Sequence, residues 1–435
     1  MRILRAWECN TDKEIAKLKQ QLSVLGGLST NQRTTVLKII SDVQKLGDKA
    51  IVKYSRRFDK VSLSPDEFRV KDREIEDAYK KISPQFVKSI QQASNNIRAY
   101  QEHIKIRNVS PLKTSGVVLD TLYSPIERVG VYVPGGAASY PSTVLMNAVP
   151  AKAAGVAQII MTTPPAKDGT IPPERLVAAR EAGVNEIYKA GGAQAIAALA
   201  FGTETIPRVD KIVGPGNIFV TLAKKEIFGY AGIDMLAGPS EVLIIADDEA
   251  NPSFVASDLL SQAEHAPGIS ILVTCSESLV KKVQTELKQQ LSHLKRHEDT
   301  KKCLDTFGVI ILTKNIDACV EIANALAPEH LQIMTRNPRS LLSDIKHAGA
   351  IFLGAYSPVA LGDYLAGPSH VLPTSGTARF SSGLSVNDFL KRTSVITYSK
   401  PALRKASCDI MEISEAEGLN AHTQSVQIRL KGARS

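Results

Sequence analysis

The chain of 435 residues has few cysteines, few aromatic residues and no apolar run long enough to span a bilayer. Its five cysteines are odd in number and form no Cys-x-x-Cys pair, which argues against a disulfide framework and against a thiolate zinc site. The segment from Met1 to Ile15 soon turns polar and charged, so we expect no signal peptide. These absences favour a protein of the reducing cytoplasm that has no membrane partner.

The formal charge is +9, from 53 basic and 44 acidic residues. Such a surplus attracts phosphate groups or nucleic acid. A nucleic-acid groove, however, gathers its basic residues on one face and interleaves them with aromatic residues. Here the basic residues form short clusters along the chain, and aromatic residues make up only 5%. We therefore expect a solvated surface and no nucleic-acid partner.

The length of the chain predicts two or more domains, because one hydrophobic core does not grow to this size. The N-terminal third is expected to be helical, with helices at 11–22, 30–46 and 84–103. From Gly116 onward, short apolar runs alternate with helical segments. Beyond Gly376 the alternation stops, and a polar, mostly helical tail is expected to the end of the chain.

Strand–helix alternation predicts an α/β fold in which parallel sheets are covered by helices on both faces. The expected strands are 131–133, 158–162, 186–189, 211–213, 242–246, 269–275, 309–312, 331–335 and 350–353. The expected helices are 142–154, 174–182, 195–200, 218–227, 252–264, 278–294, 316–326 and 341–347. These elements make up about two sheets, and we place the seam between them near Ser240.

Three glycine-rich turns directly follow predicted strands, at 134–136, 191–192 and 214–217. Glycine lets the backbone approach a ligand closely, and the N-terminus of the helix that follows favours an anion. None of the three is the GxGxxG fingerprint of dinucleotide-binding folds. Phosphate binding and plain turn formation both remain open for them.

A second group of motifs is rich in metal-ligating and acid–base side chains. Gln262 and His265 are three residues apart on a predicted helix, so both project from one face. Imidazole is a good zinc ligand, whereas a glutamine oxygen is an uncommon one. Asp363, in a glycine-flanked loop, and His422, in the tail, would complete a four-ligand site. By spacing alone, Gln-x-x-His more often marks a pair on a helix surface.

Glu329 and His330 follow Pro328 at a predicted helix-to-strand junction. They suit a general base with a neighbouring carboxylate that orients water, since histidine works as a base near neutral pH. The alternative is that Glu329 is an exposed acid and that His330 caps the preceding helix. His370, in a loop rich in glycine and proline, is either a donor that orients a ligand or a turn residue. The remaining histidines are expected on solvated helix faces: His103, His293, His297 and His347.

Taken together and in order, these motifs resemble the histidinol dehydrogenase family over nearly the whole chain. The N-terminal half of the resemblance consists of YVPGG at 132–136, GGAQAIAALAFG at 191–202, DKIVGPGN at 210–217 and AGPSEV at 237–242. The C-terminal half consists of QAEH at 262–265, APEH at 327–330, GDY at 362–364, SHVLPT at 369–374 and AH at 421–422.

The resemblance implies an NAD-dependent, zinc-requiring, four-electron oxidation of L-histidinol through L-histidinal to L-histidine, the final steps of histidine biosynthesis. It implies that His330 takes the alcohol proton and that Glu329 activates water for the second oxidation. One zinc ion per active site is implied, with the ligands Gln262, His265, Asp363 and His422. The implied substrate contacts are Ser240, Gln262, His265, His330, Asp363, His370, Glu417 and His422. The implied NAD contacts are Tyr132, Gln194 and Asn217.

The family also implies a domain organisation and a homodimer. It implies two Rossmann-like parallel-sheet domains that lack GxGxxG, with a small N-terminal helical segment and a C-terminal dimerisation segment. The expected division is 1–26 for the helical segment, 27–131 with 241–384 for the zinc and substrate domain, 132–240 for the NAD domain, and 385–435 for a tail that reaches the active site of the other subunit. Glu417 and His422 would then complete the neighbouring site.

Three other functions stay open on the sequence alone. The same ligands with Glu329 would suit a zinc hydrolase that needs no nicotinamide. An inactive binding module would keep the fold without the chemistry, although the motif residues are all present. The charge of +9 leaves a nucleic-acid binder as the third.

Manganese or cobalt would also fit a site of this ligand type.

Overall fold

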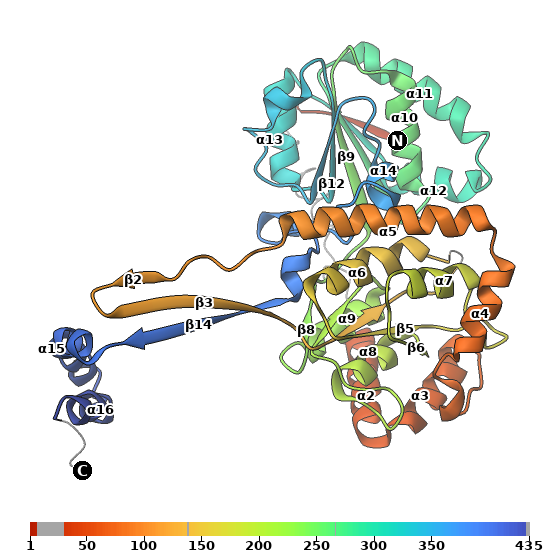
Figure 1. Cartoon of the computed structure of the whole chain (residues 1–435). Helices are drawn as coiled ribbons and strands as arrows, with labels where there is room; N and C mark the ends of the chain where they lie inside the picture. Colours follow the sequence, from red (N-terminus) through yellow and green to blue (C-terminus); the bar gives the residue numbers. More distant parts are fainter. Residues whose placement is uncertain (7–29, 137–138, 266, 432–435) are drawn as a thin grey trace. The chain divides into compact units, whose positions relative to one another are not determined.

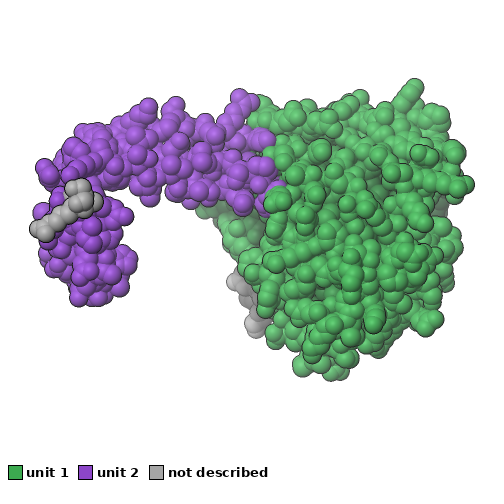
Figure 2. Space-filling model, turned by 60° about the horizontal axis from the view of Figure 1, so that its bottom comes forward, with its two compact units in different colours: residues 1–104, 127–388 green, residues 105–126, 389–435 purple. Residues whose placement is uncertain are grey.

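The computed structural model describes residues 1–6, 30–136, 139–265 and 267–431. The chain divides into two compact units, coloured green and purple in Figure 2. Unit 1 comprises Met1–Ile104 and Glu127–Asp388, and unit 2 comprises Lys105–Ile126 and Phe389–Ser435. Among the described residues, we find no helix that combines the length and the apolarity needed to cross a membrane.

Unit 1 contains a six-stranded parallel sheet, here called sheet A, with the strand order β1-β11-β10-β9-β12-β13 (Figure 1). Its strands are β1 (Arg2–Arg5), β9 (Ser240–Ala246), β10 (Gly268–Thr274), β11 (Val309–Leu312), β12 (His330–Met334) and β13 (Ala350–Leu353). One face packs against α10 (Pro252–Ala263), α11 (Glu277–Leu291) and α12 (His297–Phe307), and the other against α13 (Ile316–Leu326). Because both faces are covered, the central strands are continuous runs of buried apolar residues.

A second parallel sheet of unit 1, sheet B, has the strand order β6-β5-β4-β7-β8. Its strands are β4 (Arg128–Tyr132), β5 (Gln158–Thr163), β6 (Glu186–Lys189), β7 (Lys211–Val213) and β8 (Gly232–Ile233). The chain adds strands on one side of β4 and then on the other, so β4 borders the topological switch point where such sheets bind ligands. The connecting helices are α6 (Pro141–Ala154), α7 (Pro173–Glu181), α8 (Gly192–Phe201) and α9 (Ile218–Ile227).

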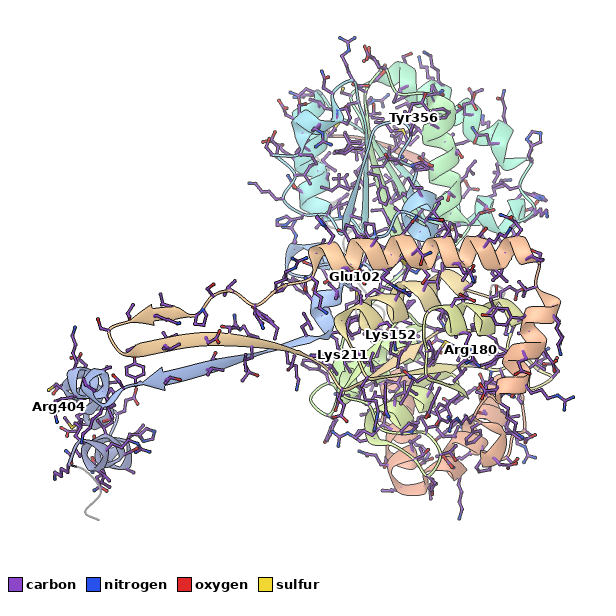
Figure 3. All side chains as sticks on the ribbon, viewed as in Figure 1. Glu102, Lys152, Arg180, Lys211, Tyr356 and Arg404 are labelled. Carbon is purple, nitrogen blue, oxygen red and sulfur yellow. The ribbon has the colours of Figure 1, made fainter. Side chains whose placement is uncertain are left out.

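The N-terminal helices of unit 1 cover sheet B. α2 (Thr30–Leu46) and α3 (Asp48–Tyr54) share a core with α8 and α9. α4 (Asp72–Lys81) lies against α7, where Arg180, labelled in Figure 3, donates to Asp72 at 2.7 Å. α5 (Pro84–Ile104) packs on α6.

Unit 2 is an antiparallel three-stranded sheet followed by a helical hairpin. Its strands are β2 (Leu112–Thr114), β3 (Val117–Pro125) and β14 (Leu390–Tyr398), in the order β14-β3-β2. The helices α15 (Lys400–Ala416) and α16 (Asn420–Lys431) pack on each other, and the hydroxyls of Ser414 and Thr423 lie 2.6 Å apart between them.

The predicted alternation of strands and helices is confirmed, and several elements agree residue for residue: 186–189, 211–213, 309–312, 316–326 and 350–353. Other predictions were wrong or incomplete. Residues 2–5, expected within a helical segment, form β1 beside β11. α12 and the nine-residue β14 were not predicted. No helix forms over 341–347, where only the 3-10 turn Pro338–Leu341 occurs. The helix expected at 11–22 lies outside the described residues.

Candidate active site

Several unit 1 residues of the second group of motifs lie at the amino-terminal edge of sheet A. Ser240 is the first residue of β9 and His330 is the first of β12, and the two strands pair with His330 opposite Val242. Gln262 and His265 come just before β10 begins. In parallel strands the amino ends lie along one edge of the sheet, so residues far apart in the sequence meet there.

His330 is buried, and its two ring nitrogens have different surroundings. Nδ1 lies 3.0 Å from the backbone oxygen of Glu241, a carbonyl that can only accept, so Nδ1 carries the proton. Nε2 is buried and has no hydrogen-bond partner among the described residues. A neutral imidazole with its proton fixed on Nδ1 presents Nε2 as an unoccupied acceptor, which is the geometry of a general base.

Glu329 is buried beside His330. Its Oε2 atom accepts hydrogen bonds from the Ser240 hydroxyl at 2.7 Å and from the Glu241 backbone N–H at 2.9 Å. Burial raises the pKa of Glu329, and the His330 imidazole and these two donors oppose the rise. The carboxyl is therefore held in one orientation, and burial keeps its pKa above the usual range of a glutamate.

Three of the predicted zinc ligands belong to unit 1. Gln262 is buried in the last turn of α10, and its Nε2 atom has no partner among the described residues. His265 was expected on this helix, but α10 ends at Ala263 and His265 lies exposed in the turn that follows. The backbone N–H of His265 donates to the backbone oxygen of Gln262 at 3.2 Å. Gly268 lies so close to that oxygen that a Cβ would clash with it.

Asp363 was expected in a loop but lies on the short helix α14 (Val359–Tyr364). Its backbone oxygen is 3.0 Å from Nδ1 of His370, a largely buried side chain. Burial lowers the pKa of His370 and the Asp363 charge opposes this, while charges on His330 and His265 lower it further. These electrostatic effects on His370 mean that Asp363, His330 and His265 lie near it.

The described residues contain no group of three or more His, Cys, Asp or Glu side chains arranged to hold a metal ion. Two of the four predicted ligands explain this: one is a glutamine, and His422 belongs to unit 2, where it is exposed on α16. Glu417, at the end of α15, is also exposed in unit 2. As a donor set, two imidazoles, a carboxylate and an amide oxygen suit zinc.

The three predicted NAD contacts line one cavity of about 680 Å³ at the carboxyl ends of the strands of sheet B. Tyr132 ends β4, and its hydroxyl accepts the Gly192 N–H at 3.1 Å. Gln194 is buried on α8, and both atoms of its amide lack partners among the described residues. Asn217 caps α9 by accepting the N–H groups of Phe219 and Val220.

A buried ion pair holds the turn before Asn217. Lys224 pairs with Asp234 and donates to the Gly214 oxygen at 3.0 Å, while Asp234 accepts the Gly214 N–H at 2.7 Å. Gly214 has a φ of 116°, and a Cβ there would overlap the backbone oxygen of Tyr132. The third glycine-rich turn therefore touches the end of β4, and this close approach needs glycine.

Comparison with known proteins agrees with this geometry. A family model described as histidinol dehydrogenase matches residues 27–430. The histidinol dehydrogenase of Clostridium acetobutylicum is 51% identical over 432 residues, which cover 99% of each chain. The crystal structure of histidinol dehydrogenase from Elizabethkingia anophelis has a TM-score of 0.92 at 38% identity and covers 99% of this chain and 98% of that one.

The chain belongs to the histidinol dehydrogenase family. It is therefore an oxidoreductase, and the resemblance found from the motifs is confirmed. The histidinol dehydrogenase of Heliobacterium mobile, 50% identical over 403 residues, covers 92% of this chain and 94% of its own.

In this histidinol dehydrogenase family member, Glu241 is a site residue that the motif analysis did not single out. Its side chain is buried, and Oε1 accepts the backbone N–H groups of Glu329 at 3.2 Å and Ser375 at 3.1 Å. Burial and the nearby Glu329 charge raise the pKa of Glu241 to about 8. Glu241 therefore positions the Glu329 backbone while it is itself neutral near pH 7. The sequence signal that could have indicated Glu241 is a single acid at the start of the apolar run SEVLIIA.

We expect Glu241→Gln to change how stability depends on pH. The folded-state pKa of Glu241 lies above that of the unfolded chain, so the folded protein binds more protons between about 4.5 and about 8, and stability falls as pH rises through that window. A neutral glutamine accepts the same two hydrogen bonds and cannot ionise. Urea unfolding at about pH 5 and about pH 9 should show a smaller loss of stability on the alkaline side than in wild type.

Glu321→Gln, the same change at an exposed position of α13, is the matched control and should behave as wild type does. A wild-type stability that rises from about pH 5 to about pH 9 relative to Glu241→Gln would contradict the raised pKa of Glu241.

Proposed function

We propose that this protein catalyses the NAD-dependent, zinc-requiring oxidation of L-histidinol through L-histidinal to L-histidine, the final steps of histidine biosynthesis. The observation that carries the proposal is the arrangement of His330 and Glu329. A base with a buried, unoccupied Nε2 lies next to a carboxyl held by Ser240 and Glu241. Family membership supplies the substrate and the reaction class.

In the first oxidation, His330 Nε2 removes the hydroxyl proton of L-histidinol as the carbinol hydride leaves. The Nδ1–H bond to the Glu241 oxygen holds the ring in the tautomer that this step needs. Bound NAD would supply the hydride acceptor in both oxidations. The carboxyl of Glu329 lies beside this ring, with Oε2 3.5 Å from His330 Nδ1.

In the second oxidation, Glu329 removes a proton from water as the oxygen of that water adds to the aldehyde carbon. As the oxygen adds, the imidazolium of His330 returns its proton to the former aldehyde oxygen. The hydrated aldehyde then has a hydroxyl and a carbinol hydrogen, so the neutral His330 repeats its role, and the acid that forms ionises to the carboxylate. Because Ser240 and Glu241 both donate to Oε2, the other carboxyl oxygen is left for water. Retaining the aldehyde in a buried site protects it from side reactions.

Zinc would hold the imidazole and amino groups of the substrate, an orienting role rather than a redox one. Gln262, His265 and Asp363 would ligate it from unit 1, with the partner subunit's His422 as the fourth ligand. Ser240 and His370 would contact the substrate, together with the partner subunit's Glu417.

A homodimer through unit 2 is part of the proposal. Unit 2 carries many large apolar side chains that are exposed, including Leu112, Leu122, Ile396, Ile413 and Ile428. Exposed apolar surface of this kind marks a protein–protein interface. Unit 2 also holds Glu417 and His422, which gives a reason for the dimer to share its active sites.

Tyr132, Gln194 and Asn217 would hold NAD in the cavity of sheet B. The two partnerless amide atoms of Gln194 support this, because a buried amide without hydrogen bonds is costly and a bound ligand would satisfy it. The cavity lies at the switch point of a parallel sheet, where nucleotide cofactors bind in such folds.

Absorbance of the reduced nicotinamide tests the proposal. With L-histidinol and NAD, we expect two NAD molecules to be reduced per histidinol, and we expect a chelator to abolish the reaction and added zinc to restore it. No reduction by metal-replete protein would refute the dehydrogenase and favour a zinc hydrolase, which hydrolysis assays would then examine. Reduction that is unaffected by removal of the metal would refute the zinc requirement alone.

A further inference from the structure

The cavity of sheet B has one acidic residue among the described residues that line it, Asp59. In dinucleotide-binding folds, an acid at the end of the second strand usually accepts the hydroxyls of the adenosine ribose. Here β5 ends at Thr163, and the first acid after it, Asp168, accepts hydrogen bonds from Thr170 and is not among the residues that line the cavity. Asp59 instead reaches the cavity from the N-terminal helical layer that covers the sheet.

The local chain holds Asp59 in place. It ends the π-helical turn Ser55–Asp59 that continues α3, and Lys60 reverses the chain with a φ of 59°. The Lys60 ammonium donates to the Arg57 oxygen at 2.9 Å. Phe58, next to Asp59, also lines the cavity; its ring is 46% exposed and stacks on Tyr54 with centroids 5.7 Å apart.

The carboxyl of Asp59 lacks the donors that a buried anion needs. Its Oδ2 atom is buried without a hydrogen-bond partner among the described residues. Burial raises the pKa of Asp59 to about 6, so the group is ionised at neutral pH. Burial raises the pKa of Tyr132 to about 12, and the charge of Asp59 contributes to this rise. Asp59 therefore lies close to Tyr132, one of the predicted cofactor contacts. A ligand with paired hydroxyls would supply two donors to this carboxylate.

The fold indicates which half of a dinucleotide would meet Asp59. Within unit 1, α3 lies at the opposite end from β9 and β12, whose first residues form the candidate active site (Figure 1). The nicotinamide must reach His330, so the half of the cofactor near Asp59 is the adenosine half. Phe58, the neighbour of Asp59, adds partly exposed apolar surface to the cavity at the same end.

Building on the proposed use of NAD, we propose that Asp59 accepts the 2′- and 3′-hydroxyls of the adenosine ribose and thereby selects NAD over its 2′-phosphorylated counterpart. A 2′-phosphate would remove one donor and place a dianion beside a partly desolvated carboxylate. Lys167 and Arg175 also line the cavity and suit the diphosphate that both cofactors share. We therefore assign the preference for NAD over its 2′-phosphorylated counterpart to Asp59.

Calorimetric titration with ADP-ribose and with ADP-ribose 2′-phosphate tests this without turnover. Wild type should bind ADP-ribose at least about tenfold more tightly than the phosphorylated form. Asp59→Asn should weaken ADP-ribose binding by about tenfold and reduce the preference to within about threefold. Asp66→Asn, the same change at an exposed acid seven positions away, should leave both affinities unchanged. Asp59→Ser should behave like Asp59→Asn, and thermal unfolding of each variant verifies that it folds.

A preference for ADP-ribose that survives in both Asp59 variants would overturn the inference, and so would a wild type that binds both ligands equally. The reduction of NAD by L-histidinol, measured on the same preparations, judges the proposed function separately. Wild type that reduces NAD but shows no preference would refute the role of Asp59 and leave the dehydrogenase activity standing. Wild type that neither binds ADP-ribose nor reduces NAD would refute both.

Discussion

Replacing His330 by asparagine should lower kcat for L-histidinol oxidation by about 10²- to 10⁴-fold, the usual contribution of a positioned general base. Asparagine can still donate to the Glu241 oxygen that Nδ1 contacts, so the local packing should survive. It has no basic nitrogen in place of Nε2, so the alcohol proton has no acceptor. Initial rates of NAD reduction give kcat, and KM for histidinol should change much less than kcat.

His293→Asn makes the same substitution on the surface, since His293 is exposed, and should leave kcat and KM unchanged. A variant that keeps kcat within a few-fold of wild type would rule out His330 as the base.

Much of the fold was predictable because the parallel strands are short and buried on both faces. The run VLIIA in β9 and the run VIIL of β11 are apolar at every position, which sets them apart from the helices between them. The caps were also local signals: Asn217, Asn251 and Ser276 each accept a backbone N–H at the start of a helix.

The elements that sequence reasoning missed depend on contacts between distant segments. β14 pairs with β3, whose residues come more than 260 positions earlier, and both strands are largely exposed, so neither shows a clear alternation of apolar residues. The failed helix at 341–347 has a tertiary cause. Asn324 of α13 donates to the Asp344 oxygen and accepts the Lys346 N–H, which takes up backbone groups that a helix would have used.

The candidate site divides in the same way. His330 and Gln262 were predictable because the side chains themselves have the chemistry, and the family motifs name them. Glu241 and Asp59 were not, because their importance lies in what surrounds them: Glu241 holds the backbone of Glu329, and Asp59 reaches the cavity from a helical layer that precedes sheet B. An acid in a sequence shows its charge but not its burial or its lack of partners.

Glu329→Gln should separate the two oxidations. Glutamine can accept the same hydrogen bonds from Ser240 and Glu241, so the site should keep its shape. It cannot take a proton from water, so oxidation of L-histidinal should slow by about 10²- to 10³-fold while oxidation of L-histidinol keeps most of its rate. The yield of reduced NAD in the first turnovers should fall from two toward one per histidinol.

Trapping with semicarbazide makes the separation visible, because an aldehyde that is not hydrated and oxidised accumulates and can be captured. Wild type should yield little trapped aldehyde, whereas Glu329→Gln should yield about one per histidinol consumed. Glu321→Gln, an exposed carboxylate on the preceding helix, is the control and should behave as wild type. If Glu329→Gln slows both oxidations equally, Glu329 acts through His330, whose Nδ1 lies 3.5 Å from its carboxyl, and the water-activating role is wrong. The ratio of the two rates, rather than the size of either loss, therefore distinguishes a base for water from a residue that tunes the histidine.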